Sequence, residues 1–573
     1  MCGIYGFIAD LEDPAGALRG MQGALLHRGP DHQEYLLDGR LGLGHNRLAI
    51  LDLTSAGHQP MTLTEAGLTL VFNGEIFNYR ELKRGLGEHV YSSQSDSEVL
   101  LRAYQKWGSD CLTRLNGMFA FAVWDHRRES LFLARDRFGI KPLVYAETPR
   151  GFFFASEPKA LFSAGIPKQP DLETWATYLK YGTYDHSDRT FFEGVRQLRP
   201  GHFLTVNLSA NVSAGCYYDF PELVSGSRAV ESEETVQQEY GSLMRDAVDL
   251  CFRSDVPVGI AASGGVDSSA LIAMASKTAQ TQEQVQAFTF TCDHPKYDET
   301  PWVKETLQLT NHPWHVSRVF SHQIPDLIES VSMSQEEPFG GFSTLCLAEL
   351  CDLAGGVGVT VLLDGNGLDE QWAGYEYYGR IGVDSEEYQS GPVQGSTTSP
   401  VRPTCLTNEI TQAARNPDLP KPFRSDLDNL RFRDLFHTKI PRALRFSDRA
   451  SMMHSRELRV PFLDHRLVEY SFKIAPSLLI RNGQHKYLLR KIVADLLPEP
   501  VVSAPKRPVQ TPQREWLAGV LFPYVWDLVN SRRFRELGWF NLPEVECELL
   551  QFKGTEPDNS FFVWQWISAA LLA

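Results

Sequence analysis

A cysteine stands at position 2, where only Met1 separates it from the amino end of the chain. If Met1 is removed, Cys2 carries its own α-amine, and a pKa of about 7.7–8.0 suits such an amine to accept a proton at neutral pH. The amine would then activate the adjoining thiol as a nucleophile. The alternative is a thiol packed in the first strand, and the position of Cys2 alone does not decide between the two.

Polar side chains at expected strand ends and loops suit an amino-acid substrate. They lie in three segments, NRLAILDL (46–53), FNGEIFNY (72–79) and SDSEVLL (95–101). An arginine such as Arg47 can hold an α-carboxylate through two hydrogen bonds, and a carboxylate such as Asp96 can hold an α-ammonium. The Asn73 amide and the Gly74 N–H can stabilise an oxyanion. We therefore expect a pocket beside the thiol, formed by Arg47, Asn73, Gly74, Glu75 and Asp96.

The segment VPVGIAASGGVDSS (256–269) indicates a phosphate site. An apolar strand, expected to end at Ala262, precedes two glycines and the predicted start of a helix. Glycines allow the backbone to approach a phosphate, and the amides at a helix start point at the anion. Asp267 can hold Mg²⁺ against the same phosphates. The segment lacks the Gly-Lys-Ser/Thr ending of a Walker loop; the alternative is an ordinary turn rich in serine and glycine.

Two further segments carry charged residues that suit the same site. In VTVLLDGNGLDEQWAGYEYY (359–378) a strand is expected to end at Leu363, and acidic residues including Asp369 follow. Because ligands of parallel sheets bind at the carboxyl ends of strands, we expect this loop to face the phosphate loop, with Asp267 and Asp369 as Mg²⁺ ligands. Lys486 in GQHKYLLRK (483–491) would stabilise developing negative charge. The alternatives are a solvated, helix-capping turn for the acidic loop and a surface charge for Lys486.

Composition places limits on the class of protein. A chain of 573 residues is too long for one ordinary core, so several domains are expected. A net charge of −16 argues against a nucleic-acid partner. We expect no secretory signal, because a basic segment followed by a long apolar one is not seen at the start of the chain, and no apolar run is long enough to span a membrane. Nine cysteines without a CxxC spacing favour reduced thiols. We expect a cytoplasmic protein with no membrane partner.

The predicted elements change in character along the chain. Short apolar runs broken by glycine fill the first two hundred residues and predict antiparallel strands, with a helix near residues 97–108. Residues 200–232 look irregular. From residue 233, the apolar runs VPVGIAA, VQAFTFT and VGVTVLL alternate with helical sequence, which predicts a parallel sheet. The polar stretch at 384–404 is interpreted as a mobile surface loop, and helices are expected from there to a docked terminal helix, FVWQWISAALLA.

Several motifs together resemble known families. MCGI, HRGPD (27–31), FNGEIFNY and RDRFGIKPL (135–143) resemble the class II glutamine amidotransferases. With SGGVDSS, YDET (297–300), GNGLDE and RVPFLDHRLVE (459–469), the whole chain resembles a glutamine-hydrolysing asparagine synthetase. The resemblance implies an α+β domain over residues 2–210, with the antiparallel sandwich of amino-terminal nucleophile hydrolases. It implies a connecting segment over 211–232. The rest, 233–573, would be an α/β domain of the ATP pyrophosphatase type with a helical carboxyl-terminal part.

The resemblance also implies roles for single residues. Cys2 would attack the amide of glutamine, Asn73 and Gly74 would stabilise the oxyanion, and the ammonia would pass through an internal tunnel to the second domain. There ATP, with Mg²⁺ on Asp267 and Asp369, would adenylate a small carboxylate, and Lys486 would be catalytic. A homodimer is implied. Glutamine would be bound by Arg47, Asn73, Gly74, Glu75 and Asp96. ATP would be bound by Ala261, Ser263, Gly264, Gly265, Asp267, Ser268, Phe290, Asp364 and Gly365.

One loop departs from the family pattern. Asparagine synthetases usually carry Ser-Gly-Glu-Gly-x-Asp-Glu where this chain has DGNGLDE, so that Asp364 replaces the serine and Asn366 the glutamate. An asparagine amide cannot act as a base. Asn366 is therefore a candidate for the acceptor pocket, and the acceptor is either aspartate or another carboxylate. Together with TKIPRALRFSDRASM (438–452), the loop resembles homologues thought to amidate sugar uronic acids. The glycines of PFGGFST (338–344) would widen such a pocket.

Two other classes of protein compete with this interpretation. A ring-closing ligase of the β-lactam synthetase type adenylates without glutamine, and the retained Cys2, Asn73, Gly74 and Asp96 argue against it. A non-catalytic storage or regulatory protein would keep the fold alone. The intact nucleophile, phosphate loop and Lys486 argue against that alternative.

Overall fold

The computed structural model describes residues 1–87, 90–226, 229–277, 285–380, 399–505, 511–555 and 559–573. Its amino-terminal part contains two six-stranded antiparallel sheets. The first has the order β10-β8-β9-β1-β3-β2, and the second has the order β12-β11-β7-β6-β5-β4. The strands of the first sheet are β1 (Gly3–Ala9), β2 (His32–Asp38), β3 (Leu41–Arg47), β8 (Val144–Thr148), β9 (Gly151–Ala155) and β10 (Val195–Gln197). Those of the second are β4 (Met61–Leu63), β5 (Leu68–Ile76), β6 (Gly117–Asp125), β7 (Ser130–Arg135), β11 (His202–Asn207) and β12 (Val212–Cys216).

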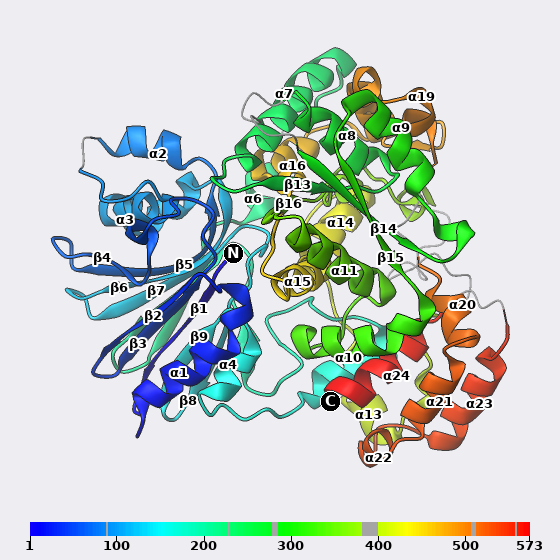
Figure 1. The fold of residues 1–573 in the computed structure, drawn as a ribbon, viewed down its shortest axis with the longest axis horizontal. Helices are drawn as coiled ribbons and strands as arrows, with labels where there is room; N and C mark the ends of the chain where they lie inside the picture. The colour runs from blue at the N-terminus through cyan, green and yellow to red at the C-terminus, as the bar shows by residue number, and fades with distance from the viewer. Residues whose placement is uncertain (88–89, 227–228, 278–284, 381–398, 506–510, 556–558) are drawn as a thin grey trace.

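The two sheets pack face to face and are covered on their outer faces by helices (Figure 1). Alternation along β1 shows how the sequence achieves this, because side chains of a strand point to opposite faces in turn. Ile4 and Ile8 pack between the sheets, whereas Tyr5 and Phe7 pack toward α1. The helices of this part are α1 (Pro14–Ala24), α2 (Tyr79–Leu86), α3 (Asp96–Trp107), α4 (Pro158–Ser163) and α5 (Leu172–Tyr181). The expected antiparallel sandwich and the helix near residues 97–108 are confirmed.

The expectation that residues 200–232 are irregular was wrong. β11 pairs with β7 and with β12, and α6 (Phe220–Val224) follows. The turn between the strands is held by the Asn207 side chain, which accepts hydrogen bonds from Ser209 N and Asn211 N. β12 is an edge strand of sequence VSAGC, so it lacks the apolar alternation by which a strand is recognised. The boundary that we placed at residue 210 lies inside this hairpin.

The carboxyl-terminal part is built on a five-stranded parallel sheet with the order β15-β14-β13-β16-β17. One face packs against α7 and α8, and the other packs against α11. The three predicted strands are confirmed, and two further strands, the outermost in the sheet, were not predicted because they are short or contain polar residues. The strands are β13 (Val258–Ala261), β14 (Gln286–Cys292), β15 (Trp314–Val319), β16 (Val361–Leu363) and β17 (Glu457–Arg459), with a small hairpin of β18 (Ile480–Arg481) and β19 (Gln484–His485).

Helices surround this sheet and form most of the chain after it. Those around the sheet are α7 (Glu233–Cys251), α8 (Val266–Ala275), α9 (Thr300–Thr310), α10 (Ile324–Gln335), α11 (Phe342–Gly356) and α12 (Leu368–Gln371). The later ones are α13 (Asn408–Ala413), α14 (Asp426–Arg433), α15 (Lys439–Met452), α16 (His465–Ser471), α17 (Pro476–Leu479), α18 (Tyr487–Val493), α19 (Glu499–Ser503), α20 (Gln513–Ala518), α21 (Phe522–Val529), α22 (Arg532–Glu536), α23 (Leu542–Phe552) and α24 (Phe561–Leu572). Most of the polar stretch at 384–404 lies outside the described residues.

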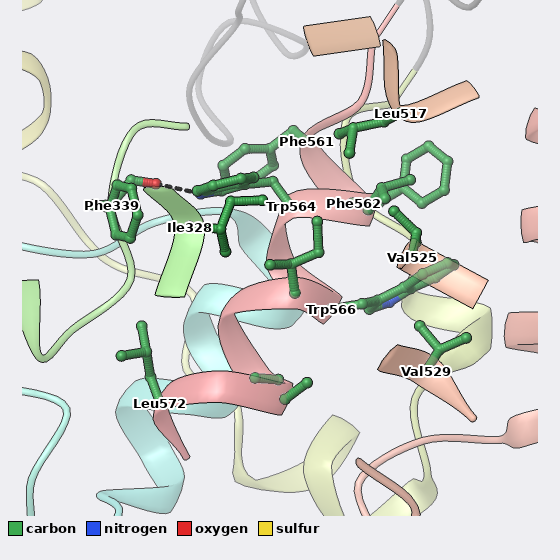
Figure 2. Packing of buried hydrophobic residues seen from close by; sticks show 14 of the residues in the cluster. Ile328, Phe339, Leu517, Val525, Val529, Phe561, Phe562, Trp564, Trp566 and Leu572 are labelled. Atoms are coloured by element: carbon green, nitrogen blue, oxygen red, sulfur yellow. Dashed lines mark hydrogen bonds between the residues drawn. The ribbon is translucent and has the colours of Figure 1, made fainter. Parts of the chain in front are cut away.

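The terminal helix α24 is the centre of a large apolar cluster (Figure 2). Trp564 and Trp566 are both buried, and the Trp564 indole donates a hydrogen bond of 2.6 Å to Phe339 O. α24 also contacts α5 of the amino-terminal part, so it ties the two parts together. The docked terminal helix is therefore confirmed. No helix among the described residues is long and apolar enough to cross a membrane.

Candidate active sites

The thiol of Cys2 lies where the two sheets of the sandwich meet. Cys2 N donates a hydrogen bond of 3.0 Å to Asn73 Oδ1 on β5, and the thiol faces Leu48 O at 3.8 Å. The other end of the amide, Asn73 Nδ2, is buried and has no hydrogen-bond partner among the residues that the structure describes. A buried donor without a partner is costly, and this one could donate a hydrogen bond to an anion formed beside the Cys2 thiol.

Position 74, next to Asn73, accepts only glycine because of its backbone conformation and its close neighbours. Its φ of 154° lies in the region that favours glycine. A side-chain carbon at this position would lie 2.1 Å from Met118 O on the adjacent strand β6. No larger residue therefore fits here, and β5 and β6 hold the Gly74 backbone and the Asn73 amide in a defined position beside Cys2.

Met1 occupies the junction between the two parts of the molecule (Figure 1). Its α-ammonium lies 3.4 Å from Glu457 Oε2, and both groups are fully buried. Its side chain packs with Leu48 of the first part and with residues of the second, including Val361 and Met452. Burial raises the pKa of the Cys2 thiol. While Met1 is attached, Cys2 has no free amine to accept the proton of this thiol.

The residues expected to bind glutamine surround Cys2 with different local roles. Arg47 is buried, and its guanidinium donates to the carbonyls of Leu51, Asp52 and Thr54, the last at 2.7 Å. It therefore braces that loop. Glu75 lies 3.5 Å from Arg459 of the second part, and burial, followed by the charge of Asp96, raises its pKa. Asp96 accepts a hydrogen bond of 2.8 Å from Ile76 N, and burial raises its pKa to about 6.

The second site is a cavity of about 320 Å³ at the carboxyl ends of β13, β14 and β16. The structure brings every residue that we expected at the nucleotide and the metal, together with Asn366, into its lining. These residues are Ala261, Ser263, Gly264, Gly265, Asp267, Ser268, Phe290, Asp364, Gly365, Asn366, Asp369 and Lys486. They meet because β16 pairs with β13, so that Leu363 lies beside Ile260 and the two following loops leave the sheet together.

The phosphate loop is closely packed and leaves helix amides available. No side chain of the described residues caps the start of α8, so its first N–H groups are available to an anion. The Ser268 hydroxyl donates to Ser263 O at 2.7 Å, which closes the loop on itself. A side-chain carbon at Gly264 would lie 2.9 Å from Trp302 Cβ, and one at Gly365 would lie 3.1 Å from Ser268 N. Both glycines therefore allow close approach of the backbone.

Lys486 connects the phosphate loop and the acidic loop by contacting one carboxylate of each. Its Nζ lies 2.6 and 2.7 Å from the carboxylate oxygens of Asp267, and 2.5 Å from Asp369 Oδ1. Burial alone would lower the pKa of Lys486, but the two facing carboxylates outweigh it and the pKa is raised. The sequence suggested a place on a helix; Lys486 is the residue that precedes α18, and it has a left-handed backbone (φ 55°).

The same two carboxylates fit a divalent cation. Asp267 and Asp369 converge within hydrogen-bond reach of one ammonium, and hard oxygen donors suit Mg²⁺. No group of three or more histidine, cysteine, aspartate or glutamate side chains suited to a metal occurs within the part of the chain that the structure describes. A cation held by this pair would therefore take its remaining ligands from phosphates and water.

Sequence reasoning missed several residues that line the cavity. Leu347 and Leu350 reach it from α11 and Ala504 from the end of α19, elements with no recognisable site motif, and Ser447 and Arg490 reach it from α15 and α18. The glycines of PFGGFST do not line it: Gly340 packs on Phe446 and Gly341 on Gln513. No pattern of spacing in the sequence marks the missed residues, because tertiary packing alone brings these helices to the cavity.

Comparison with known proteins finds two domains in succession along the chain. Residues 1–218 match the model of a glutamine amidotransferase domain, and residues 239–572 match that of asparagine synthase. The fold and the matches thus define a class of protein in which a glutamine amidotransferase domain precedes a synthetase domain. The chain belongs to the family of the glutamine-hydrolysing asparagine synthetases.

Relatives in this family match the chain over most of its length. Asparagine synthetase [glutamine-hydrolyzing] 3 of Bacillus subtilis is 30% identical, with 91% of this chain and 89% of that protein covered. Asparagine synthetase [glutamine-hydrolyzing] 2 of the same organism is 32% identical, with 89% and 71% covered. A protein of Gibberella zeae named amidase chry2 is 26% identical, with 94% and 93% covered.

Proposed function

We propose that this protein is an ATP-dependent, glutamine-hydrolysing amidotransferase that converts a carboxylate into its amide, with glutamate, AMP and pyrophosphate as the other products. One observation carries the proposal: Met1, whose loss would free the Cys2 amine, lies between Cys2 and the strands β16 and β17 of the second domain. The site that would release ammonia and the sheet that holds the second site therefore meet at one place.

In the first half-reaction, the Cys2 amine would accept the thiol proton and the thiolate would attack the amide carbon of glutamine. Asn73 Nδ2 and Gly74 N–H would stabilise the oxyanion. Arg47 would hold the α-carboxylate, and Glu75 and Asp96 would hold the α-ammonium. Collapse of the tetrahedral species would release ammonia and leave a thioester on Cys2, which water would hydrolyse to glutamate.

Ammonia would then cross to the second domain through the space that Met1 vacates. That space is bounded by the apolar side chains of Leu48, Ile50, Val361 and Met452. Apolar walls disfavour the charged ammonium ion and so would keep ammonia neutral and nucleophilic. Glu457 would stand at this passage after losing the Met1 ammonium as its partner.

In the second half-reaction, ATP would adenylate the acceptor. The loop from Ser263 to Ser268 would hold the pyrophosphate portion, and Lys486 would stabilise the charge that develops on the phosphates. Mg²⁺ held by Asp267 and Asp369 would neutralise part of the negative charge of the phosphates. Ammonia would replace AMP on the acyl carbon and give the amide.

The acceptor is aspartate or another carboxylate, and a sugar uronic acid or a natural-product carboxylate is the alternative that Asn366 favours. The neutral amide of Asn366 lines the cavity where a carboxylate is usual in the family. Relatives that match nearly the whole chain carry both names, asparagine synthetase and amidase, so family membership leaves the acceptor open. We further propose that the protein is a homodimer and is located in the cytoplasm.

The test is ATP–pyrophosphate exchange across a panel of L-aspartate, D-glucuronate and a short peptide with a free carboxylate. Only a carboxylate that the protein adenylates supports exchange, so the assay identifies the acceptor. Glutamate release from glutamine is measured on the same preparation after mass spectrometry has confirmed the loss of Met1. Absence of exchange with every acceptor would favour the non-catalytic alternative, and absence of glutamate release would remove the amidotransferase assignment.

A further inference from the structure

Formation of an amide from ammonia produces a proton that must leave the nitrogen. When ammonia attacks the acyl carbon, the C–N bond forms and the nitrogen becomes positively charged. The bond from carbon to the AMP oxygen then breaks, and one proton must be removed to leave the neutral amide. A group in the second site that accepts this proton speeds the step by about 10²–10⁴-fold. This reasoning rests on the proposed function.

Four carboxylates line the cavity, and three of them have strong partners. Asp267 and Asp369 face the Lys486 ammonium at 2.5–2.7 Å. Glu370 accepts a hydrogen bond of 2.8 Å from the Tyr375 hydroxyl. Asp364 accepts one from Asn366 N at 2.8 Å, and no ion pair or hydroxyl contact is found for it among the residues that the structure describes. Its second oxygen is therefore the one best placed to take a proton.

The position of Asp364 suits this role. It follows Leu363 of β16, which pairs with Ile260 of β13, the strand that leads into the phosphate loop. The next residue, Gly365, touches that loop, because a side-chain carbon there would lie 3.1 Å from Ser268 N. On its other side β16 pairs with β17, the strand that contacts Met1 through Glu457. Asp364 thus lies at the carboxyl end of the inner strand β16, between the phosphate loop and the side from which ammonia would arrive.

We propose that Asp364 is the proton acceptor for the attack of ammonia on the activated carboxylate. Its free carboxylate oxygen takes the proton from the attacking nitrogen as AMP leaves with the electrons of the broken C–O bond. Asn366 cannot do this, because an amide nitrogen does not accept a proton at neutral pH. Burial raises the pKa of Asp364 to about 6, so the group is ionised at pH 7 but closer to proton uptake than an exposed aspartate.

The test compares adenylation with amide formation in Asp364→Asn. The new amide oxygen still accepts the Asn366 N–H, so the loop keeps its turn, but the proton acceptor is gone. ATP–pyrophosphate exchange and amide formation from ammonium chloride are measured with whichever of L-aspartate, D-glucuronate or the peptide supports exchange in the unsubstituted protein. We expect amide formation to fall about 100-fold or more, far more than exchange falls. AMP would then be released in excess over amide, as the activated carboxylate is hydrolysed.

A second variant keeps the proposal falsifiable if the loop is sensitive. Asp364→Ser with Asn366→Glu moves the carboxylate two residues along the same loop, and it should recover amide formation that Asp364→Ser alone loses. An equal loss of exchange and amide formation in Asp364→Asn would assign Asp364 to nucleotide binding and overturn the inference. Unchanged amide formation would do the same. Absence of exchange in the unsubstituted protein would instead contradict the proposed function, and the inference would fall with it.

Discussion

Substitution of Asn73 by alanine separates a catalytic role of this side chain from a structural one. In the structure its Oδ1 accepts one hydrogen bond from Cys2 N, while its buried Nδ2 has no partner within the described part of the chain. Loss of one oxyanion donor typically costs about 3 kcal/mol of transition-state stabilisation, which lowers the rate about 10²–10³-fold. The same change removes an unsatisfied buried donor, whose cost of about 1–3 kcal/mol offsets the lost hydrogen bond. The free energy of unfolding should therefore change little.

The assay follows glutamate release from glutamine, amide formation from ammonium chloride and urea unfolding on one preparation. We expect Asn73→Ala to lose about 10²–10³-fold in glutamine hydrolysis, while ammonia-driven amide formation continues. Asn429→Ala is the matched control, because Asn429 is also buried but uses both ends of its amide, donating to Phe423 O and accepting from Phe423 N at 2.8 Å each. That variant should lose stability without a selective loss of glutamine hydrolysis.

Two results would refute the reasoning. If Asn73→Ala hydrolyses glutamine nearly as well as the unsubstituted protein, Nδ2 is not a donor to the oxyanion. If it loses glutamine-driven and ammonia-driven activity together, along with stability, the side chain is structural and its unpartnered nitrogen has no catalytic meaning.

Three further predictions concern the thiol, the lysine and the pH dependence. Cys2→Ala should abolish glutamine-driven amide formation and spare the ammonia-driven reaction, and an unchanged glutamine-driven rate would exclude Cys2 as the nucleophile. Lys486→Gln should abolish ATP–pyrophosphate exchange, and retained exchange would show that Lys486 is dispensable. The same variant should lower the free energy of unfolding, measured in urea without Mg²⁺, by about 3–5 kcal/mol, because Asp267 and Asp369 then face each other without a cation. The pKa of Asp96 is raised to about 6, so as the pH falls through that value the carboxylate takes up a proton and loses its attraction for the glutamine ammonium. The KM for glutamine should rise by up to about tenfold per pH unit below 6, and a KM that stays constant down to pH 5 would contradict this role.

Much of the fold follows from local patterns in the sequence. The apolar runs at β13 and β16 are continuous because both faces of a parallel sheet are buried, whereas β14 mixes apolar residues with threonines; all three were recognisable from these patterns. The edge strand β12 was missed because its residues are small or polar, and it is a strand only through its pairing with β11. β17 was missed for a related reason: Glu457 and Arg459 look like surface residues but are fully buried.

In the candidate sites too, some features were recognisable from local sequence and others depend on tertiary packing. The motifs around Cys2, the phosphate loop and the acidic loop were recognisable because their residues adjoin in the chain or follow a strand. By contrast, Lys486 Nζ meets Asp267 across 219 residues of sequence, and only packing brings α18 to that place. The unpartnered Asn73 Nδ2 is likewise a property of the packed molecule, since it depends on every neighbour of that atom.

By itself, the sequence determined the chemistry available to this protein: a thiol next to the chain start, a glycine- and serine-rich loop after a strand, and an acidic loop in which aspartate and asparagine stand at positions 364 and 366. Such features are local, because they depend on the order of neighbouring residues. Tertiary structure alone decided that Met1 lies against Val361, Met452 and Glu457, and that Asp364 is the lining carboxylate without a strong partner among the described residues. The physical reason is that burial and pairing arise between segments hundreds of residues apart, and these set which groups are free to react.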